Sequence, residues 1–498
     1  MNSSKSSPKP GGKSFYKFKE VQPFDLFYQL TYMSAMASAG ISRSQTFLFA
    51  ARSPSPVAGY FSAVNTLVEE MRYDYPEACR IIAQKAKAEA MKSFLLQLSD
   101  ALRSGEPLAE FLAREAAVQS DHFKNMYERD LEGLKNWTDA FSSIMVSVAL
   151  IVIIQLVSSM IYSMDTRMIA GLVTTAVIIG FFGAWIISRA APQEVMTVAA
   201  AVGSTEQRQA RRLTQIMVPI AAVIGLVLAL AGLNRGWVLI GVAALLLPSG
   251  IVSLRSDSKL SKKDIEFGTL LRSLGGMAAS TGTTLKVALT KIDLTSFPTL
   301  QPDLDRLIKR LQAQVEPEIC WQQFGQESGS QLIREATDIF YSAVRLGGQP
   351  DRVGYLCSLF VATTSQLRAK RRIVAATFSG LTLVMQAVMA GLMVFVLEII
   401  LNFARLLQEV LTPDNASLAS ENIALPMAVL TPEQLSFLTV LTVVMIILLA
   451  MISTLAIVAS DGGFKLKFAF YLALALLISG VSFLVVPPVV ASIILSTQ

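Results

Sequence analysis

Seven stretches of this chain are each long and apolar enough to form a helix that crosses a lipid bilayer. A bilayer core about 30 Å thick needs about 20 residues of helix. Only 16% of the 498 residues are charged, against about 25% in soluble domains, and the mean hydropathy is +0.51. The composition predicts an all-α, polytopic membrane protein with spans at 141–162, 168–188, 213–232, 236–254, 373–404, 434–460 and 468–495.

The positions of lysine and arginine indicate how these spans are oriented. With a cytoplasmic N-terminus, the outer loops hold only Arg167, Arg235 and Arg405 of the 43 basic residues. The short inner loops at 189–212 and 462–467 are basic, and positive charge is retained on the cytoplasmic side of membranes. We therefore expect a multi-pass protein of the cytoplasmic membrane, with its N-terminus inside, its C-terminus outside and outer loops at 163–167, 233–235 and 405–433.

The segments between the spans predict two cytoplasmic helical modules, at 23–140 and 255–372. In the first, Leu95, Leu98 and Leu102 recur at helical spacing, and neither segment has the alternation typical of strands. We expect a disordered basic tail at 1–22, four transmembrane helices in two hairpins at 141–254, a fifth at 373–404, an extracytoplasmic loop at 405–433, and two more transmembrane helices at 434–495.

An internal repeat relates the two modules. "ASAG" at 37–40 matches "ASTG" at 279–282, and "DALRSG" at 100–105 matches "SAVRLG" at 342–347, both at an offset of 242 in the numbering. Two matches at one offset indicate a tandem unit. Small residues allow helices to approach closely, so we expect Gly40, Gly282, Gly105 and Gly347 to pack in the cores of the repeats.

Charge distinguishes the second module from the first. Residues 23–136 carry 12 basic and 14 acidic side chains, whereas residues 256–373 carry 16 basic and 12 acidic ones. The excess fits either an ordinary solvated surface or a docking surface for an acidic partner. The candidate docking residues are Arg306, Lys309, Arg310, Lys262, Lys263, Arg334 and Arg345.

The sequence shows no catalytic, cofactor-binding or metal-binding motif. There is no phosphate-binding G-x-x-x-x-G-K-[ST], and the single histidine, His122, lies outside the spans. The three cysteines are far apart in the sequence and are expected to be small buried hydrophobic residues. Glu398, the one ionisable residue in a span, lies near the outer end of its helix and is interpreted as a packing contact. We expect a protein that is not an enzyme and has no cofactor; the alternative is a secondary transporter, which should show polar groups at mid-membrane depth.

Several longer motifs resemble one known family. They are "PFDLFYQLTYMSAMASAGISRSQTFLFAA", "FLLQLSDALRSGEPLAEFLARE", "RAAPQEV", "FGTLLRSLGGMAASTGTTLKVAL" and "LRAKRRIVAATFSGL". They resemble the archaeal-type platform membrane proteins of type IV filament systems, the type II secretion system F-family that includes the archaellum assembly protein and Tad-like pilus platforms.

The resemblance implies a function and a set of partners. It implies a platform that couples a hexameric cytoplasmic secretion ATPase to the insertion of pilin- or archaellin-like subunits into a filament. The partners expected are that ATPase, the filament subunits, membrane lipid and a second copy in a homodimer, with no nucleic acid. The family has no residue that is catalytic for bond chemistry, and its motifs do not identify the filament.

Overall fold

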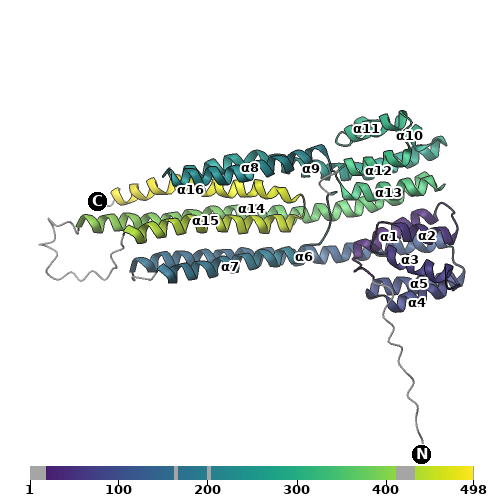
Figure 1. The fold of residues 1–498 in the computed structure, drawn as a ribbon, viewed down its shortest axis with the longest axis horizontal. Helices are drawn as coiled ribbons and strands as arrows, with labels where there is room; N and C mark the ends of the chain where they lie inside the picture. Colours follow the sequence, from purple (N-terminus) through teal and green to yellow (C-terminus); the bar gives the residue numbers. More distant parts are fainter. Residues whose placement is uncertain (1–17, 162–165, 199–202, 411–431, 497–498) are drawn as a thin grey trace, which may run out of the picture. The chain divides into compact units, whose positions relative to one another are not determined.

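The computed structural model describes residues 18–161, 166–198, 203–410 and 432–496 (Figure 1). Most of the tail expected at 1–22, and most of the loops expected at 163–167 and 405–433, lies outside the described residues. The α-helices are α1 Pro23–Ala37, α2 Arg43–Arg52, α3 Ala58–Glu69, α4 Tyr75–Lys85, α5 Glu89–Ser104, α6 Leu108–Ile161, α7 Thr166–Ala190, α8 Thr205–Leu230, α9 Arg235–Thr281, α10 Leu285–Lys291, α11 Gln301–Gln312, α12 Pro317–Glu327, α13 Gln331–Arg345, α14 Pro350–Val410, α15 Pro432–Asp461 and α16 Phe468–Ser496, with short 3₁₀ helices η1 Leu294–Ser296 and η2 Lys465–Lys467.

The predicted all-α fold is confirmed. The described residues form helices and turns, with one isolated antiparallel bridge between Thr197 and Ser330. Seven of the described helices are long and apolar enough to cross a membrane: α6, α7, α8, α9, α14, α15 and α16. Three of these, α6, α9 and α14, are much longer than a bilayer requires, because each continues into a segment that the sequence assigned to a cytoplasmic module.

The chain divides into two compact units. The repeat unit comprises Met1–Met126, Asp264–Gly325 and Leu332–Thr364, and the span unit comprises Tyr127–Lys263, Gln326–Gln331 and Ser365–Gln498. Both predicted modules thus contribute to one unit. The segments 127–140, 255–263 and 365–372, which the sequence assigned to the modules, belong to the span unit instead.

The helix boundaries support the internal repeat. Helix α4 recurs as α12, α5 as α13 and α6 as α14, and each later helix starts at the same offset that separates the repeated motifs. Backbone conformation recurs as well: Arg72 and Gln314, which are related by this offset, both have a φ of 58°. A positive φ is uncommon for any residue other than glycine, so its recurrence at equivalent positions is strong evidence for a common helix arrangement.

An aromatic cluster lies where the two repeats meet inside the repeat unit. The ring of Phe27 on α1 lies 5.7 Å from that of Phe123 on α6 and 5.0 Å from that of Phe360 on α14. All three side chains are buried. Burial of large aromatic side chains dominates the energetics of such contacts, so the cluster gives the two repeats a shared core.

The four repeat glycines correct the packing expectation. Gly40, Gly105, Gly282 and Gly347 have φ values of 71°, 78°, 60° and 98°, and a Cβ placed on any of them would meet nothing within 4 Å. They follow the ends of α1, α5, α9 and α13. Glycine is common there because it adopts the left-handed conformation without strain. The motif therefore marks helix ends, not helix–helix contacts.

Close packing through glycine occurs elsewhere in the second repeat. A Cβ on Gly275 of α9 would lie 2.3 Å from the carbonyl oxygen of Pro350, and one on Gly354 of α14 would lie 2.5 Å from that of Leu271. Only a residue without a side chain allows two helix backbones to approach this closely. Helices α9 and α14 therefore cross at these two glycines.

Candidate functional site

A buried guanidinium lies at the centre of the polar contacts in the span unit. Arg371 on α14 is 2% exposed and donates hydrogen bonds to the carbonyl oxygens of Ser460 (2.9 Å), Ala459 (3.2 Å) and Pro192 (2.8 Å). Ser460 and Ala459 end α15, where helix carbonyls have no partner within the helix. Gly462 follows with a φ of 66°, and a Cβ there would lie 2.2 Å from the guanidinium. The absence of a side chain at Gly462 thus leaves room for the guanidinium of Arg371 in the turn after α15.

A second buried contact joins α9 to the same turn. The carboxylate of Asp257 on α9 accepts hydrogen bonds from Lys467 Nζ (2.6 Å), Arg372 Nη2 (2.9 Å) and the amide of Phe464 (3.1 Å). Lys467 also forms an ion pair with Asp461 at the end of α15. Two cations therefore face two carboxylates, and the cluster is neutral.

Lys467 is buried together with its two partners. Its side chain is 4% exposed, and those of Asp257 and Asp461 are 5% and 9% exposed. A buried charge is stable only when it is paired and hydrogen-bonded, and both conditions hold for Lys467.

The segment after α7 is attached by a third ion pair. The side chain of Glu194 lies 2.6 Å from that of Arg368 on α14, and both side chains are largely buried. The hydroxyl of Tyr127 on α6 lies 3.4 Å from the same carboxylate. Nearer the surface, Lys370 pairs with Glu128 at 2.6 Å. We call the set Glu194, Asp257, Arg368, Arg371, Arg372, Asp461 and Lys467 the junction.

The junction lies at one end of the apolar spans. Asp257 comes three residues after the fourth span predicted at 236–254, and Arg372 directly precedes the span predicted at 373–404. The three long helices and the turns α7–α8 and α15–α16 are linked there. Charges buried in pairs hold a fixed geometry, because separating them exposes unpaired charge. The arrangement therefore ties these helices and turns together at fixed positions within the span unit.

A hydrogen-bonded clip attaches the α12–α13 turn within the span unit. The amide of Val198 donates to the carbonyl oxygen of Gly329 (3.1 Å), and the amide of Gln331 donates to that of Met196 (3.2 Å). The side chain of Gln207 on α8 also donates to the Gly329 carbonyl oxygen (3.2 Å). The turn belongs to the span unit although α12 and α13 mostly belong to the repeat unit.

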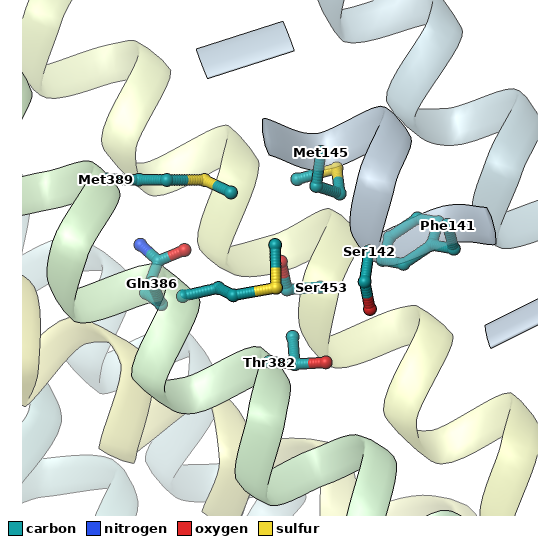
Figure 2. A pocket seen from close by; sticks show the side chains of 8 residues that line it. Phe141, Ser142, Met145, Thr382, Gln386, Met389 and Ser453 are labelled. Atoms are coloured by element: carbon teal, nitrogen blue, oxygen red, sulfur yellow. The ribbon is translucent and has the colours of Figure 1, made fainter. Parts of the chain in front are cut away.

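Polar side chains among the spans bind neighbouring helices. Figure 2 shows a small cavity lined by α6, α14 and α15, with Gln386, Met145, Met389 and Ser453 around it. Gln386 donates to Ser479 Oγ of α16 (3.1 Å), which is a hydrogen bond between two helices. Glu398 is half-buried and interacts electrostatically with Arg235. This pairing fits a structural role for Glu398.

Comparison with known proteins identifies the first repeat. Residues 30–157 match the family described as type II secretion system (T2SS), protein F, a range that begins in α1 and ends in the apolar part of α6. The first repeat and its following span carry a type II secretion system protein F domain. The resemblance stated from the motifs is thereby confirmed.

The chain is similar to two curated proteins. It is 26% identical over 310 residues to the flagella accessory protein J of Methanocaldococcus jannaschii, and 24% identical over 304 residues to that of Methanococcus voltae. Each match covers 59% of this chain and 54% of the relative, so the chain spans about half the length of the curated relatives it matches. No solved structure matches the chain.

The candidate docking residues lie in several different environments. On α11, Lys309 is exposed, Arg306 pairs with the buried carboxylate of Asp303, and Arg310 is half-buried. Lys262 is exposed. Lys263, in contrast, is 7% exposed. It is therefore not part of an exposed docking surface, and its choice as a candidate docking residue is corrected.

The remaining two candidates lie on α13. Arg334 is half-buried, and its main chain and side chain lie against Gly325. Arg345 pairs with Glu318 of α12. Within the seven candidates, Lys309 and Lys262 are thus the cations that the structure leaves exposed without a salt bridge among the described residues.

Reasoning from sequence missed most of the junction. The run "LRAKRR" entered the sequence analysis only as part of a motif that resembles a known family, and neither this motif nor the charges near the spans pointed to Asp257, Asp461 or Glu194. One signal was present: each of these carboxylates is an acidic residue within a few positions of the end of an apolar span. A charge so close to hydrocarbon needs a partner, and the basic run was the available one.

Proposed function

We propose that this chain is the membrane platform of a type IV filament machine, coupling a hexameric cytoplasmic secretion ATPase to the insertion of pilin- or archaellin-like subunits. The F domain and the two accessory-protein relatives support the class of machine. The observation that carries the proposal is the continuity of α6, α9 and α14, which leave the spans without a break and enter the two repeats.

The proposed coupling is mechanical. A helix held by its backbone hydrogen bonds is a stiff rod of about 1.5 Å per residue, so movement of a repeat would displace its own membrane helix. The junction would carry this displacement sideways, because the ion pairs of Asp257 and Glu194 and the hydrogen bonds of Arg371 join separate helices and turns. The chain itself would then need no catalytic residue.

The transporter alternative lacks a supporting observation. A transporter needs polar groups at mid-membrane depth, but Glu398, the one ionisable residue in the predicted spans, lies near the outer end of its span and interacts with Arg235. We therefore propose a non-enzymatic assembly protein that spans the membrane with its N-terminus inside and its C-terminus outside.

Replacement of Lys309 tests ATPase docking on α11. Lys309→Glu should weaken binding of the cognate secretion ATPase to the detergent-solubilised full chain by about five- to tenfold, because surface charge steers such encounters. Lys309 is preferred to Arg306, whose replacement would remove its ion pair with the buried carboxylate of Asp303.

Lys291→Glu provides a matched control for this measurement. Lys291 is also exposed in the second repeat, at the end of α10, and its reversal changes the net charge equally. Binding is measured by pull-down at two salt concentrations. If Lys309→Glu and Lys291→Glu bind the ATPase as tightly as the wild type does, α11 is not the docking surface.

Complementation tests the assembly function as a whole. A strain that lacks this gene should form no filament, and the wild-type gene should restore it. The double variant Asp257→Asn, Lys467→Met should insert into the membrane yet restore few filaments, since it removes the junction's central pair. Normal filament numbers without the gene would contradict the proposal.

A further inference from the structure

Helix α8 packs against the rest of the span unit less than any other apolar helix. Only 6% of its apolar 18-residue stretch is buried, whereas 33–44% of the corresponding stretch is buried in each of the other six helices. Its contact with α9 includes Gly225, where an added Cβ would lie 2.7 Å from the side chain of Val242. Most of the α8 surface is therefore not covered by the described residues of the other helices.

One face of α8 is both basic and apolar along its length. Arg208, Arg211 and Arg212 are exposed in its first two turns, at the i, i+3 and i+4 spacing that places side chains on one face. The same spacing continues through the exposed apolar residues Ile216, Val223, Val227 and Leu230. This face thus begins with three guanidinium groups and continues with apolar side chains. We call it the α8 stripe.

Helix α9 carries a further exposed arginine near this end of α8. Lys259 of α9 pairs with Glu206 of α8 at 2.8 Å, so the two helices adjoin there. Arg255 lies one turn from Lys259 on the same face of α9 and is exposed. Among the described residues, no carboxylate pairs with Arg208, Arg211, Arg212 or Arg255, and Glu206 is already engaged.

Helix geometry adds to the positive potential. The N-terminus of α8 carries the positive end of the helix dipole. Its first turn is capped reciprocally: the Gln207 amide donates to Ser204 Oγ (3.3 Å), and the Ser204 amide donates to Gln207 Oε1 (3.2 Å). The capped turn fixes where the arginines that follow are presented.

We propose that the α8 stripe binds an anionic phospholipid, with its phosphate held by Arg208, Arg211 and Arg212 and an acyl chain along Ile216, Val223 and Val227. Guanidinium groups bind phosphate through paired hydrogen bonds. The apolar part of the stripe begins one turn after Arg212, at Ile216. The occupant must combine an anionic head with an apolar tail, and a phospholipid has both.

Charge argues against a second copy on this face. In a two-fold symmetric pair, each residue near the axis meets its own counterpart. Two α8 helices packed side by side along this stripe would bring arginine against arginine. Such like-charge contact opposes association. An anionic lipid neutralises the same charges, so the inference is independent of the proposed role in filament assembly.

Lipid titration of the full chain tests the proposal. The protein is purified in a neutral detergent, and its melting temperature is followed as phosphatidylglycerol or phosphatidylcholine is added. The wild type should be stabilised by phosphatidylglycerol at lower concentration than by phosphatidylcholine. Arg208→Gln, Arg211→Gln, Arg212→Gln should require on the order of 100-fold more phosphatidylglycerol, since each basic residue near an anionic surface contributes about fivefold.

A matched triple variant controls for charge. Arg43→Gln, Arg52→Gln, Arg103→Gln removes three exposed arginines of the first repeat and should leave the lipid response unchanged. Melting temperatures without lipid should agree for all three proteins, which shows that the variants fold. Native mass spectrometry should find one more phosphatidylglycerol retained by the wild type than by the α8 variant.

Four outcomes would overturn the assignment. They are equal stabilisation by the two lipids, an equal response of the two triple variants, full stabilisation by inorganic phosphate at the lipid's concentration, and a change from dimer to monomer in the α8 variant. The third would indicate an anion site that does not use the apolar stripe. The last would indicate that a second copy covers it.

Discussion

At the scale of the residue, Lys467 shows how the span unit holds a buried charge. Lys467→Met should lower the free energy of unfolding by about 3–5 kcal/mol, because removing one partner leaves buried charge uncompensated. The carboxylate of Asp461 would lose the lysine with which it pairs, while Asp257 would keep Arg372.

Thermal unfolding of the detergent-solubilised chain measures this effect. Lys465→Met is the control, since Lys465 lies two residues away in the same 3₁₀ helix and is exposed. It should leave the melting temperature nearly unchanged. Equal melting temperatures for the two variants would mean that the ion pairs of Lys467 contribute nothing to stability.

Asp338 should make stability depend on pH in the repeat unit. Burial raises the pKa of its carboxyl group, against a hydrogen bond from the Tyr28 hydroxyl and the charge of Arg334, which lower it. The folded chain then keeps a proton that the unfolded chain has released. Stability should therefore fall as pH rises from the ordinary value of 3.8 through the raised pKa.

Asp338→Asn should reduce this pH dependence. The amide retains an acceptor for Tyr28 but carries no charge to bury, so the variant should be at least as stable as the wild type at pH 7, with the difference shrinking at pH 4. Asp100→Asn, at an exposed position on α5, serves as the control. If the melting temperatures of the wild type and of Asp338→Asn changed in parallel between pH 4 and pH 7, the assignment would be contradicted.

At the scale of the element, glycine conformation sets where the repeat helices end. Gly282 has a φ of 60° and open space around it, so Gly282→Ala and Gly282→Leu should each cost about 1–2 kcal/mol, the strain of a left-handed residue. Gly282→Asn should cost less, because asparagine adopts this conformation more readily. A crowded site would instead make leucine much worse than alanine.

Gly276→Ala is the control for this series. Gly276 lies within α9, has no positive φ and would meet nothing within 4 Å. Alanine there should stabilise the chain by about 0.5–1 kcal/mol, because glycine loses more conformational entropy in a helix. Destabilisation by Gly276→Ala would show that a contact, not backbone conformation, governs these glycines.

At the scale of the whole molecule, basic residues predict which ends of the spans face the cytoplasm. Cysteine introduced at position 235 should react with a membrane-impermeant maleimide on intact cells, and cysteine at position 465 should react only after lysis. Arg235 and Lys465 are both exposed. The native cysteines are buried and should give little background. Labelling of both positions from the same side would contradict the seven-span arrangement.

The sequence by itself determined the class of structure. Apolar runs of about 20 residues admit one interpretation, because an unpaired backbone is too costly in hydrocarbon. Seven described helices of this kind are present. The constant spacing between the paired motifs likewise indicated the repeat, since helix ends depend on local backbone conformation, and local conformation is encoded locally.

Only the tertiary structure decided what the charges and glycines do. Arg371 bonds to a carbonyl 179 residues away and Asp257 to an amide 207 residues away, and no local pattern links such positions. Gly275 and Gly354 are packing glycines, whereas Gly40 and Gly282 are not, although Gly275 and Gly282 lie in the same small-residue stretch. The difference depends on what faces each Cα after folding, which is set by the other helix.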